Sequence, residues 1–185
     1  MDKVIFETPS EFLKIKSAET TPYFYVERKG IDSVAFILFD ENRDEYFGVT
    51  NERKPPMDER FGELAFIETA FGGSNDIIDY SVYSAMNENE IVENMREIVK
   101  IEAKEEAGYT VDSKHIQFIS KEFVSTQMNQ WVYLFLVDVS GLSQGKTEPQ
   151  NATEAMATVV WKNTKQVQKM SDWKTKTIVF NVLAV

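Results

Sequence analysis

Apolar and polar residues alternate along this chain with two different periods. Residues 34–39 form an unbroken apolar run, polar residues follow at 40–44, and apolar residues resume at 46–50. Two short apolar runs separated by a polar segment are typical of two strands joined by a turn. Further short runs at 64–71, 116–119, 131–137 and 157–161 predict four more strands, the first of which ends at Gly72 and Gly73.

One longer segment has the helical period instead. Between about Glu88 and Ala107, apolar residues recur every three or four positions and form one broad stripe. Gly108 follows directly, and glycine is the residue that most often ends a helix. A second helix is predicted from Asp172 to Leu183, although its β-branched residues also fit a strand. Strands on both sides of a central helix predict a mixed β-sheet covered by helices, within the α/β class.

The whole chain has the size and composition of one domain. Its 185 residues, 43% of them apolar, are enough for one sizeable hydrophobic core. We assign residues 31–185 to this domain and residues 1–30 to an N-terminal arm, either an accessory strand or a dimerisation arm that would make the protein a homodimer. No apolar run approaches the roughly 18 residues of a membrane-spanning helix, and the first residues lack a signal-peptide pattern. We therefore expect a soluble, cytoplasmic protein with no membrane partner.

Charge and side-chain chemistry exclude several classes of function. The formal net charge of −10 argues against general nucleic-acid binding, since phosphate backbones are bound mainly by clustered Lys and Arg. The chain has no cysteine, which excludes disulfides, thiolate zinc sites and Cys-based catalysis. Its single histidine, His115, has no partner motif and is expected at the surface. An acidic protein can still act on phosphates, because bound cations reverse the local field.

The most informative segment is the end of the predicted helix, where three carboxylates share one side. Glu102 and Glu106 are one helical turn apart, and Glu105 lies roughly 60° away from them around the helix. Such a group of like charges is stable beside a hard cation, and oxygen-only ligands suit Mg²⁺ or Mn²⁺. Glutamates at this spacing also occur on solvated helix faces that have no function. The spacing alone leaves both interpretations open.

Residues around this cluster resemble the Nudix box, G-x5-E-x7-R-E-U-x-E-E-x-G-U, in which U is apolar. The second half of the box is matched by Glu102, Ala103, Glu105, Glu106, Gly108 and Tyr109. Two positions depart from it, because Ile101 stands where the box has its arginine and Asn87 where it has its first glycine. Glu93 falls at the position of the first glutamate. Since a Gly72-Gly73 pair occurs upstream, we interpret the box as split by an insertion from Ser74 to about Val92.

The missing arginine bears on activity. In the family this arginine braces the glutamates through charge-assisted hydrogen bonds, so its loss removes a local counter-charge. Lys100, Lys104 and Arg96 are the nearby cations that would compensate, although none has the family's position. Without compensation, metal affinity and rate would both be reduced.

Segments outside the box resemble one branch of the family, the ADP-ribose and nucleotide-sugar pyrophosphatases. Arg53 matches the arginine of the branch's Q-x-R-x-P pattern, and Glu68 matches the glutamate of its L-E-L-P-A-G pattern. The segment Asp172-Trp173-Lys174-Thr175 is weakly similar to its D-A-K-T pattern. A solvated charge at a strand end and a residue at a strand edge are equally open interpretations of Arg53 and Glu68.

The resemblance implies a fold and a reaction. The fold would be a Nudix-type α/β/α sandwich with a mixed β-sheet. The reaction would be Mg²⁺-dependent hydrolysis of the diphosphate in a nucleoside diphosphate linked to another moiety, such as ADP-ribose or a nucleotide sugar, with Mn²⁺ as the alternative cation. The partner implied is therefore a small-molecule nucleotide.

The resemblance also implies roles for individual residues. The metal ligands would be the side chains of Glu102, Glu105 and Glu106 and the backbone carbonyl of Gly72. Glu154, in the loop before residues 159–161, would be the general base, with Glu105 as a further catalytic residue. Glu148 in the same loop is the weaker candidate for the base. Arg53 and Glu68 would bind the substrate.

Two other functions remain open from the sequence. One is a catalytically weakened Nudix-fold module that binds nucleotides or has a regulatory role, for which Ile101 and the split box are the evidence. The other is an unrelated acidic interaction domain whose glutamates form a solvated helix face. A hydrolase would release product only with Mg²⁺ or Mn²⁺, whereas a binding module would gain thermal stability from its ligand without turnover. The interaction domain predicts no metal dependence.

Overall fold

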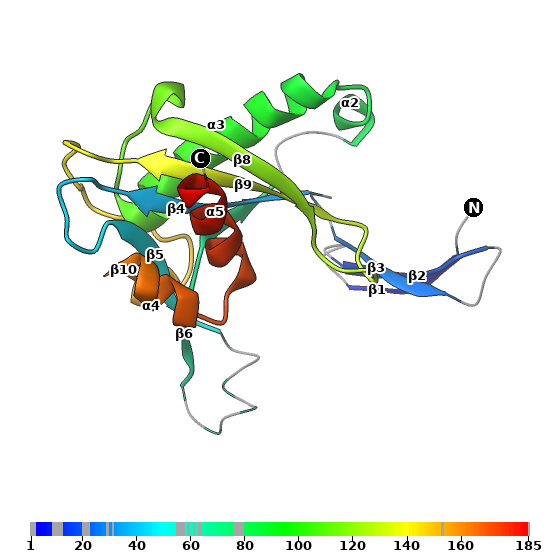
Figure 1. Ribbon diagram of the computed structural model, residues 1–185. Coiled ribbons are helices and arrows are strands. Elements are labelled where there is room, and N and C mark those ends of the chain that lie inside the picture. Colours follow the sequence, from blue (N-terminus) through cyan, green and yellow to red (C-terminus); the bar gives the residue numbers. More distant parts are fainter. Residues whose placement is uncertain are drawn as a thin grey trace.

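The structure of the chain is a computed structural model that describes residues 3–8, 13–19, 23–28, 30, 32–54, 58, 60, 62, 64–75, 80–152 and 154–184. A large sheet lies between helices, and a smaller sheet extends from one end of it (Figure 1). No helix among these residues is long and apolar enough to cross a membrane.

The large sheet contains seven strands: β4 (Ser33–Phe39), β5 (Phe47–Arg53), β6 (Phe66–Thr69), β7 (Phe71–Ser74), β8 (Ile116–Phe123), β9 (Trp131–Asp138) and β10 (Thr158–Lys162). Their order is β10-β5-β4-β9-β8, with β6 paired to β5 and β7 paired to β4. β4 and β9 run parallel, whereas every other described pair is antiparallel. The sheet is therefore mixed, as the sequence predicted.

Helices cover both faces of this sheet. α3 (Glu88–Ala107) crosses one face, and α4 (Thr164–Lys169) and α5 (Trp173–Leu183) pack on the other (Figure 1). Because side chains alternate along a strand, Phe36 of β4 belongs to the apolar cluster beneath α3, and Ile37 to the cluster beneath α5. The predicted α/β/α layers are confirmed, together with the bounds of α3 and the position of α5. Periodicity did not predict α4 or the one-turn helix α2 (Tyr80–Tyr83).

The single strand predicted at residues 64–71 is wrong, because the chain changes its partner strand there. β4 and β5 pair only at their turn-proximal ends, through Leu38–Gly48 and Phe39–Phe47, and then diverge. β6 pairs with β5 and β7 pairs with β4, so the chain crosses from one branch of this fork to the other at Ala70. Gly72 and Gly73 consequently lie inside β7, where the sequence predicted the end of a strand.

The described residues of the N-terminal arm form three strands, where the sequence predicted an accessory strand or a dimerisation arm. β1 (Lys3–Glu7), β2 (Leu13–Ser17) and β3 (Phe24–Arg28) form a separate antiparallel sheet. Its last strand is attached to the turn between β8 and β9, where the Val26 N–H donates to the Gln127 carbonyl at 2.8 Å. Arg28 Nη2 also donates to Ser74 Oγ at the end of β7, at 2.8 Å. The small sheet therefore contacts the large sheet at the open end of the fork.

The segment interpreted from the sequence as an insertion packs on the sheet through α2. The Tyr83 hydroxyl donates to the buried carboxylate of Asp32, whose other oxygen accepts from the Trp131 N–H at 2.8 Å. Burial, followed by the Asp32 carboxylate, raises the pKa of Tyr83 well above its ordinary value, so Tyr83 remains a hydrogen-bond donor. Residues 76–79 of the insertion lie outside the described residues. At its far end, Asn87 caps α3 together with Glu90.

Candidate active site

The C-terminal end of α3 is held in place by its cap. Gly108 adopts the left-handed conformation at φ 75°, as the predicted helix stop requires. Its carbonyl accepts from the Gly145 N–H at 2.7 Å, and a Cβ at Gly108 would lie only 2.6 Å from the Gly145 carbonyl oxygen. Glycine at position 108 thus ends the helix and also allows a loop to approach its end closely.

That loop, residues 140–152, runs along the end of α3. The Glu148 N–H donates to the Glu105 carbonyl at 2.8 Å, and Gln144 Nε2 donates to the Ala107 carbonyl at 2.9 Å. These bonds satisfy carbonyls at the last turn of α3 that have no partner within the helix. They also bring the following residues, which include Glu154, beside the carboxylates of α3.

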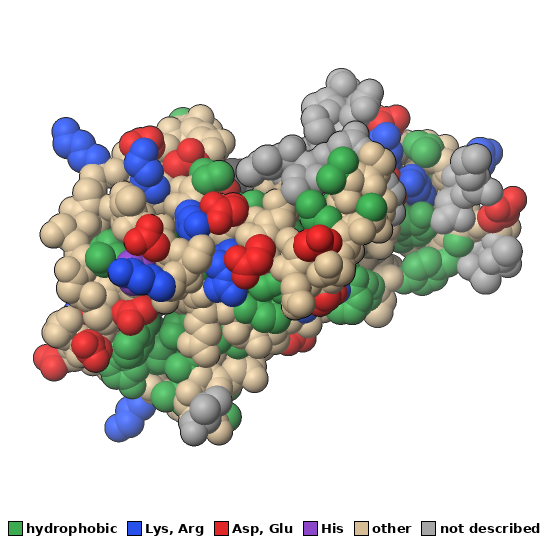
Figure 2. Space-filling model, turned by 90° about the horizontal axis from the view of Figure 1, so that it is seen from above, with side chains coloured by type: hydrophobic (Ala, Val, Ile, Leu, Met, Phe, Trp, Pro, Cys, Tyr) green, Lys and Arg blue, Asp and Glu red, His purple; other side chains and the backbone are tan. Residues whose placement is uncertain are grey.

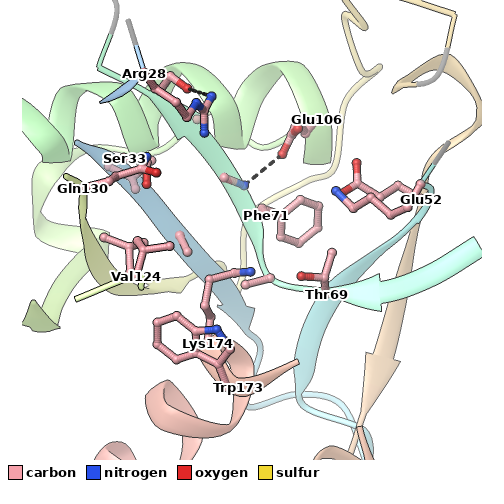
Figure 3. A pocket seen from close by; sticks show the side chains of 18 of the residues that line it. Arg28, Ser33, Glu52, Thr69, Phe71, Glu106, Val124, Gln130, Trp173 and Lys174 are labelled. Carbon is pink, nitrogen blue, oxygen red and sulfur yellow. Dashed lines mark hydrogen bonds and ion pairs between the residues drawn. The ribbon is translucent and has the colours of Figure 1, made fainter. Parts of the chain in front are cut away.

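Glu106 is the centre of the carboxylate group. It is half-buried, and one of its oxygens accepts from the Gly72 N–H of β7 at 3.4 Å (Figure 3). Burial, followed by the charges of Glu102, Glu52 and Glu154, raises the pKa of Glu106 to about 8, although the Gly72 N–H acts in the opposite direction. Three other carboxylates, from α3, β5 and the turn after the loop, therefore act on Glu106 across the fork.

Glu102 lies directly against the backbone of β7. A Cβ at Gly73 would overlap the Glu102 carboxylate, so only glycine lets this side chain take its position. Gly72 is tightly enclosed on its other side, where a Cβ would lie 2.8 Å from the Val34 carbonyl oxygen. The Gly72 N–H points to Glu106, away from β4, and the carbonyl of a strand residue points to the same side as its N–H. The Gly72 carbonyl is therefore directed to the carboxylate side of β7.

Glu154 and Glu105 both contact the loop itself. Glu154 accepts from the Gln150 N–H at 2.7 Å and from the Asn151 side chain, at the start of a short 3-10 turn (Glu154–Met156). Glu105 accepts from Gln150 Nε2 at 2.6 Å. A carboxylate has about four acceptor positions, so these bonds leave Glu154 with further positions to accept a hydrogen bond from water. Glu148, the weaker candidate for the base, pairs with Lys104 at 3.0 Å.

Two cavities meet at this group. The larger, about 480 Å³, lies in the fork of the sheet, and the smaller, about 380 Å³, lies between β7, α3 and the loop. The linings share Gly72, Gly73, Ser74, Glu106 and Glu154. Glu102 and Ile101 line the smaller cavity but not the larger one. The structure thus brings Glu102, Glu106, Glu154 and Gly72 together, while Glu105 lies beside them without lining either cavity.

The two predicted substrate-binding residues line neither cavity. Arg53 forms an ion pair with Asp58 at 2.5 Å, and Glu68 forms one with Lys162 at 2.6 Å. The side chains of Arg53 and Glu68 lie on the same face of the β5–β6 pair. Glu68 is opposite Asn51, and Asn51 is two residues from Arg53 and so on the same face of β5. Their proposed contact with substrate remains an untested prediction.

The neighbouring residues of β5 line the larger cavity instead. Glu52 and Lys54 alternate with Arg53 and therefore face the opposite side of the strand, where they pair with each other. Sequence reasoning missed both residues. The alternation of side chains along 47–53 was a usable signal, but the side of the strand that faces the site depends on the fork.

The cations expected to replace the box arginine have other partners. Arg96 pairs with Glu93 at 3.3 Å, Lys100 with Glu97 at 2.6 Å and Lys104 with Glu148. Glu93 lies within α3, nine residues before Glu102 and thus on the opposite side of the helix. Figure 2, which views the molecule from the side of α3 shown at the top of Figure 1, shows acidic and basic side chains interspersed over this face.

The carboxylates of this group are chemically suited to bind a divalent cation, but their side chains are not yet arranged around one point. Glu106, whose pKa is raised by burial and then by three neighbouring carboxylates, is the kind of group that a cation would neutralise. Across the described ranges, however, no three acidic or histidine side chains are already grouped closely enough to hold an ion. Glutamate side chains have several rotatable bonds, so binding would require a change of rotamers without movement of α3 or β7.

Comparison with known proteins gives a match in structure only. No protein-family model matches the sequence, and no curated protein matches it. A crystal structure described as an ADP compounds hydrolase is similar to the whole chain, with a TM-score of 0.65 at 12% sequence identity. The match covers 100% of this chain and 90% of the other. At this identity the likeness shows the fold alone, and it confirms the predicted fold class, a mixed α/β domain of Nudix type.

Proposed function

We propose that this protein is a Mg²⁺-dependent hydrolase that cleaves the diphosphate of a nucleoside diphosphate linked to another moiety, of the ADP-ribose or nucleotide-sugar type. The observation that carries the proposal is Glu106, a half-buried carboxylate that three other carboxylates influence at the junction of two cavities. The structural likeness to an ADP compounds hydrolase is consistent with this substrate class. A substrate with two different ends suits a site that has a cavity on each side of its reactive centre.

The proposed roles follow from position. Glu102 and Glu106, with the Gly72 carbonyl and with Glu105 after a change of rotamer, would hold the cation. When bound, Mg²⁺ would neutralise charge on the diphosphate oxygens and lower the pKa of water. Glu154 would accept a proton from the attacking water. The water oxygen then forms a bond to one phosphorus, the bridging P–O bond breaks, and two monophosphates leave.

The first test is a screen for product release with and without Mg²⁺. The screen compares ADP-ribose, nucleotide sugars, NADH, diadenosine polyphosphates and dNTPs. The proposal is supported if ADP-ribose and nucleotide sugars release monophosphates, and if they do so only when Mg²⁺ or Mn²⁺ is present. Glu106→Gln should lower turnover by about two orders of magnitude or more, because it removes a proposed ligand of the cation. Wild-type turnover in this variant would contradict the assignment.

The loop glutamates provide a matched pair for the general base. A general base contributes typically about 10² to 10⁴ in rate. Glu154→Gln should therefore lower kcat strongly with little effect on the Mg²⁺ requirement, whereas Glu148→Gln, at a residue that pairs with Lys104, should do much less. If both variants retain near wild-type kcat, the base lies elsewhere, with Glu102 as the alternative.

A nucleotide-binding or regulatory module is the second candidate. Ile101 favours it, since this side chain is 43% exposed and lines the smaller cavity at the position of the family's arginine. Ile101→Arg tests whether the site is weakened, because one restored charge-assisted bond is worth about 1.5 to 3 kcal/mol. In a weakened site this variant should tighten Mg²⁺ binding and raise the rate. In a site that needs no arginine, a Mg²⁺ titration of activity should change little.

A further inference from the structure

The larger cavity has two chemically different sides. Figure 3 shows Glu52 and Glu106 on one side, Val124 and Trp173 on the other together with the polar residues Ser33 and Gln130, and the amino group of Lys174 directed to the space between them. The acidic side is the one proposed to act on the diphosphate. The opposite side, which carries no carboxylate of this group, has no role in that chemistry.

Trp173 is held at the edge of the cavity by the start of α5. Asp172, the residue before it, caps the helix by accepting from the Thr175 N–H at 3.0 Å and the Thr175 hydroxyl at 2.8 Å. The same carboxylate accepts from the Ala70 N–H at 3.1 Å, at the crossing point of the fork. Burial alone would raise the pKa of Asp172, but Lys174 and these N–H groups lower it overall, so the cap stays ionised.

The exposure of Trp173 is not explained by packing. Its side chain is 40% exposed, and among the described residues neither of the two apolar clusters includes it. The bonds of the helix cap are made by Asp172, Thr175 and Ala70, so the cap does not require an indole at Trp173. A large aromatic face on a cavity wall is suited to contact a flat ligand ring.

Lys174 places a cation beside this ring. Its Nζ lies 5.9 Å from the centroid of the Trp173 ring and 3.0 Å from Asp172. An ammonium group has three donors, so the bond to Asp172 leaves others for an anion. The other cations of the cavity are paired with different residues, since Arg28 donates to Ser74 and Lys54 pairs with Glu52.

We infer that Trp173 and Lys174 form the nucleotide-recognition side of the cavity, where a nucleobase stacks on the indole and a phosphate oxygen accepts from the Lys174 ammonium. A flat ring joined through a sugar to a phosphate matches this order of surfaces. The inference extends the proposed function, since it states which end of the substrate enters the larger cavity. The other moiety then enters the smaller cavity beside Ile98 and Ile101.

The test measures binding of AMP and of ribose 5-phosphate by calorimetry in EDTA, which separates binding from turnover. Trp173→Leu, which keeps apolar bulk without an aromatic face, should weaken AMP binding roughly 5- to 100-fold and leave ribose 5-phosphate unaffected. Trp173→Phe should retain most of the affinity for AMP. Lys174→Met should weaken both ligands, because both carry the phosphate.

Tryptophan fluorescence gives an independent measurement. AMP should quench the emission of the wild type and of Trp161→Phe, a control at a residue that packs under Arg43 outside both cavities. The quench should disappear in Trp173→Phe. Unchanged AMP affinity in Trp173→Leu, a persistent quench in Trp173→Phe, or no AMP binding to the wild type at millimolar concentration would each overturn the inference.

The outcomes separate this inference from the proposed function. If the screen finds no hydrolysis while AMP binding still depends on Trp173, the function fails and the inference stands. If hydrolysis depends on Glu106 but AMP binding does not depend on Trp173, the inference fails and the function stands.

Discussion

At the scale of single residues, Glu106 connects stability to pH. Its pKa is raised from an ordinary value of 4.5 to about 8, so the folded state binds this proton more tightly than the unfolded state. The resulting stabilisation is fully present below pH 4.5 and is lost as the pH rises through about 8. In EDTA, the melting temperature of the wild type should therefore fall between pH 5 and 8.

Glu106→Gln should have a flatter profile over the same range, because its side chain does not ionise. Added Mg²⁺ should restore part of the stability of the wild type at pH 8, since a cation neutralises the ionised group. Parallel profiles for the two proteins, measured by thermal denaturation, would show that Glu106 does not titrate in this way.

We expect alanine substitutions at the two glycines of β7 to impair different properties, turnover at Gly73 and stability at Gly72. Gly73→Ala places a methyl group on the Glu102 carboxylate, the end of a flexible side chain, so it should lower turnover while the melting temperature changes little. Gly72→Ala places it 2.8 Å from the backbone carbonyl of Val34, which cannot move freely, so it should mainly destabilise the fold. Activity and melting temperature measured on both variants distinguish these effects. An unaffected rate in Gly73→Ala would show that the position of Glu102 does not matter.

At the scale of elements, the contact between α3 and the loop can be tested by comparing alanine substitutions at Gly108 and Gly141. Gly108→Ala and Gly141→Ala impose a similar strain, since φ is 75° and 77° at these positions. Only Gly108 has a backbone atom close by, at 2.6 Å, whereas nothing lies within 4 Å of a Cβ at Gly141. We expect Gly141→Ala to lose about 1 kcal/mol and Gly108→Ala about 2 to 4 kcal/mol, measured by urea denaturation.

The same pair tests the role of the loop in catalysis. Displacing the loop from α3 moves Glu154 away from Glu106, so turnover should fall in Gly108→Ala and remain near wild type in Gly141→Ala. Equal rates in the two variants would mean that Glu154 reaches its position without this contact.

At the scale of the whole molecule, the small sheet has an apolar row against which none of the described helices packs. Phe6, Ile15 and Val26 are paired across its three strands, and Phe6 is 54% exposed. Because an exposed row of apolar side chains on a sheet is typical of an interaction surface, we propose that a second copy of the chain covers this row. Light scattering should show a dimer, which Ile15→Lys converts to a monomer. Phe180→Lys, at an exposed position on α5, is the control, and a monomeric wild type would contradict the expectation.

The sequence by itself determined the elements whose signals are local. The stripe from Glu88 to Ala107 followed by Gly108 specified α3 and its end, because amphipathic period and left-handed glycine act within one turn of helix. The same locality placed Glu102, Glu105 and Glu106 on one side of that helix. The mixed sheet between helices followed from the order of these elements.

Only the tertiary structure decided which residues meet at the site. Residues 64–71 had the composition of one strand, but β4 and β5 diverge and the chain changes partners at Ala70. That long-range pairing directs Glu52 and Lys54 into the cavity and leaves Arg53 out of it. Trp173 likewise lines the cavity because Asp172 joins the start of α5 to Ala70, about 100 residues earlier in the chain. Contacts between such distant segments depend on the packing of the whole chain, and a local pattern does not contain them.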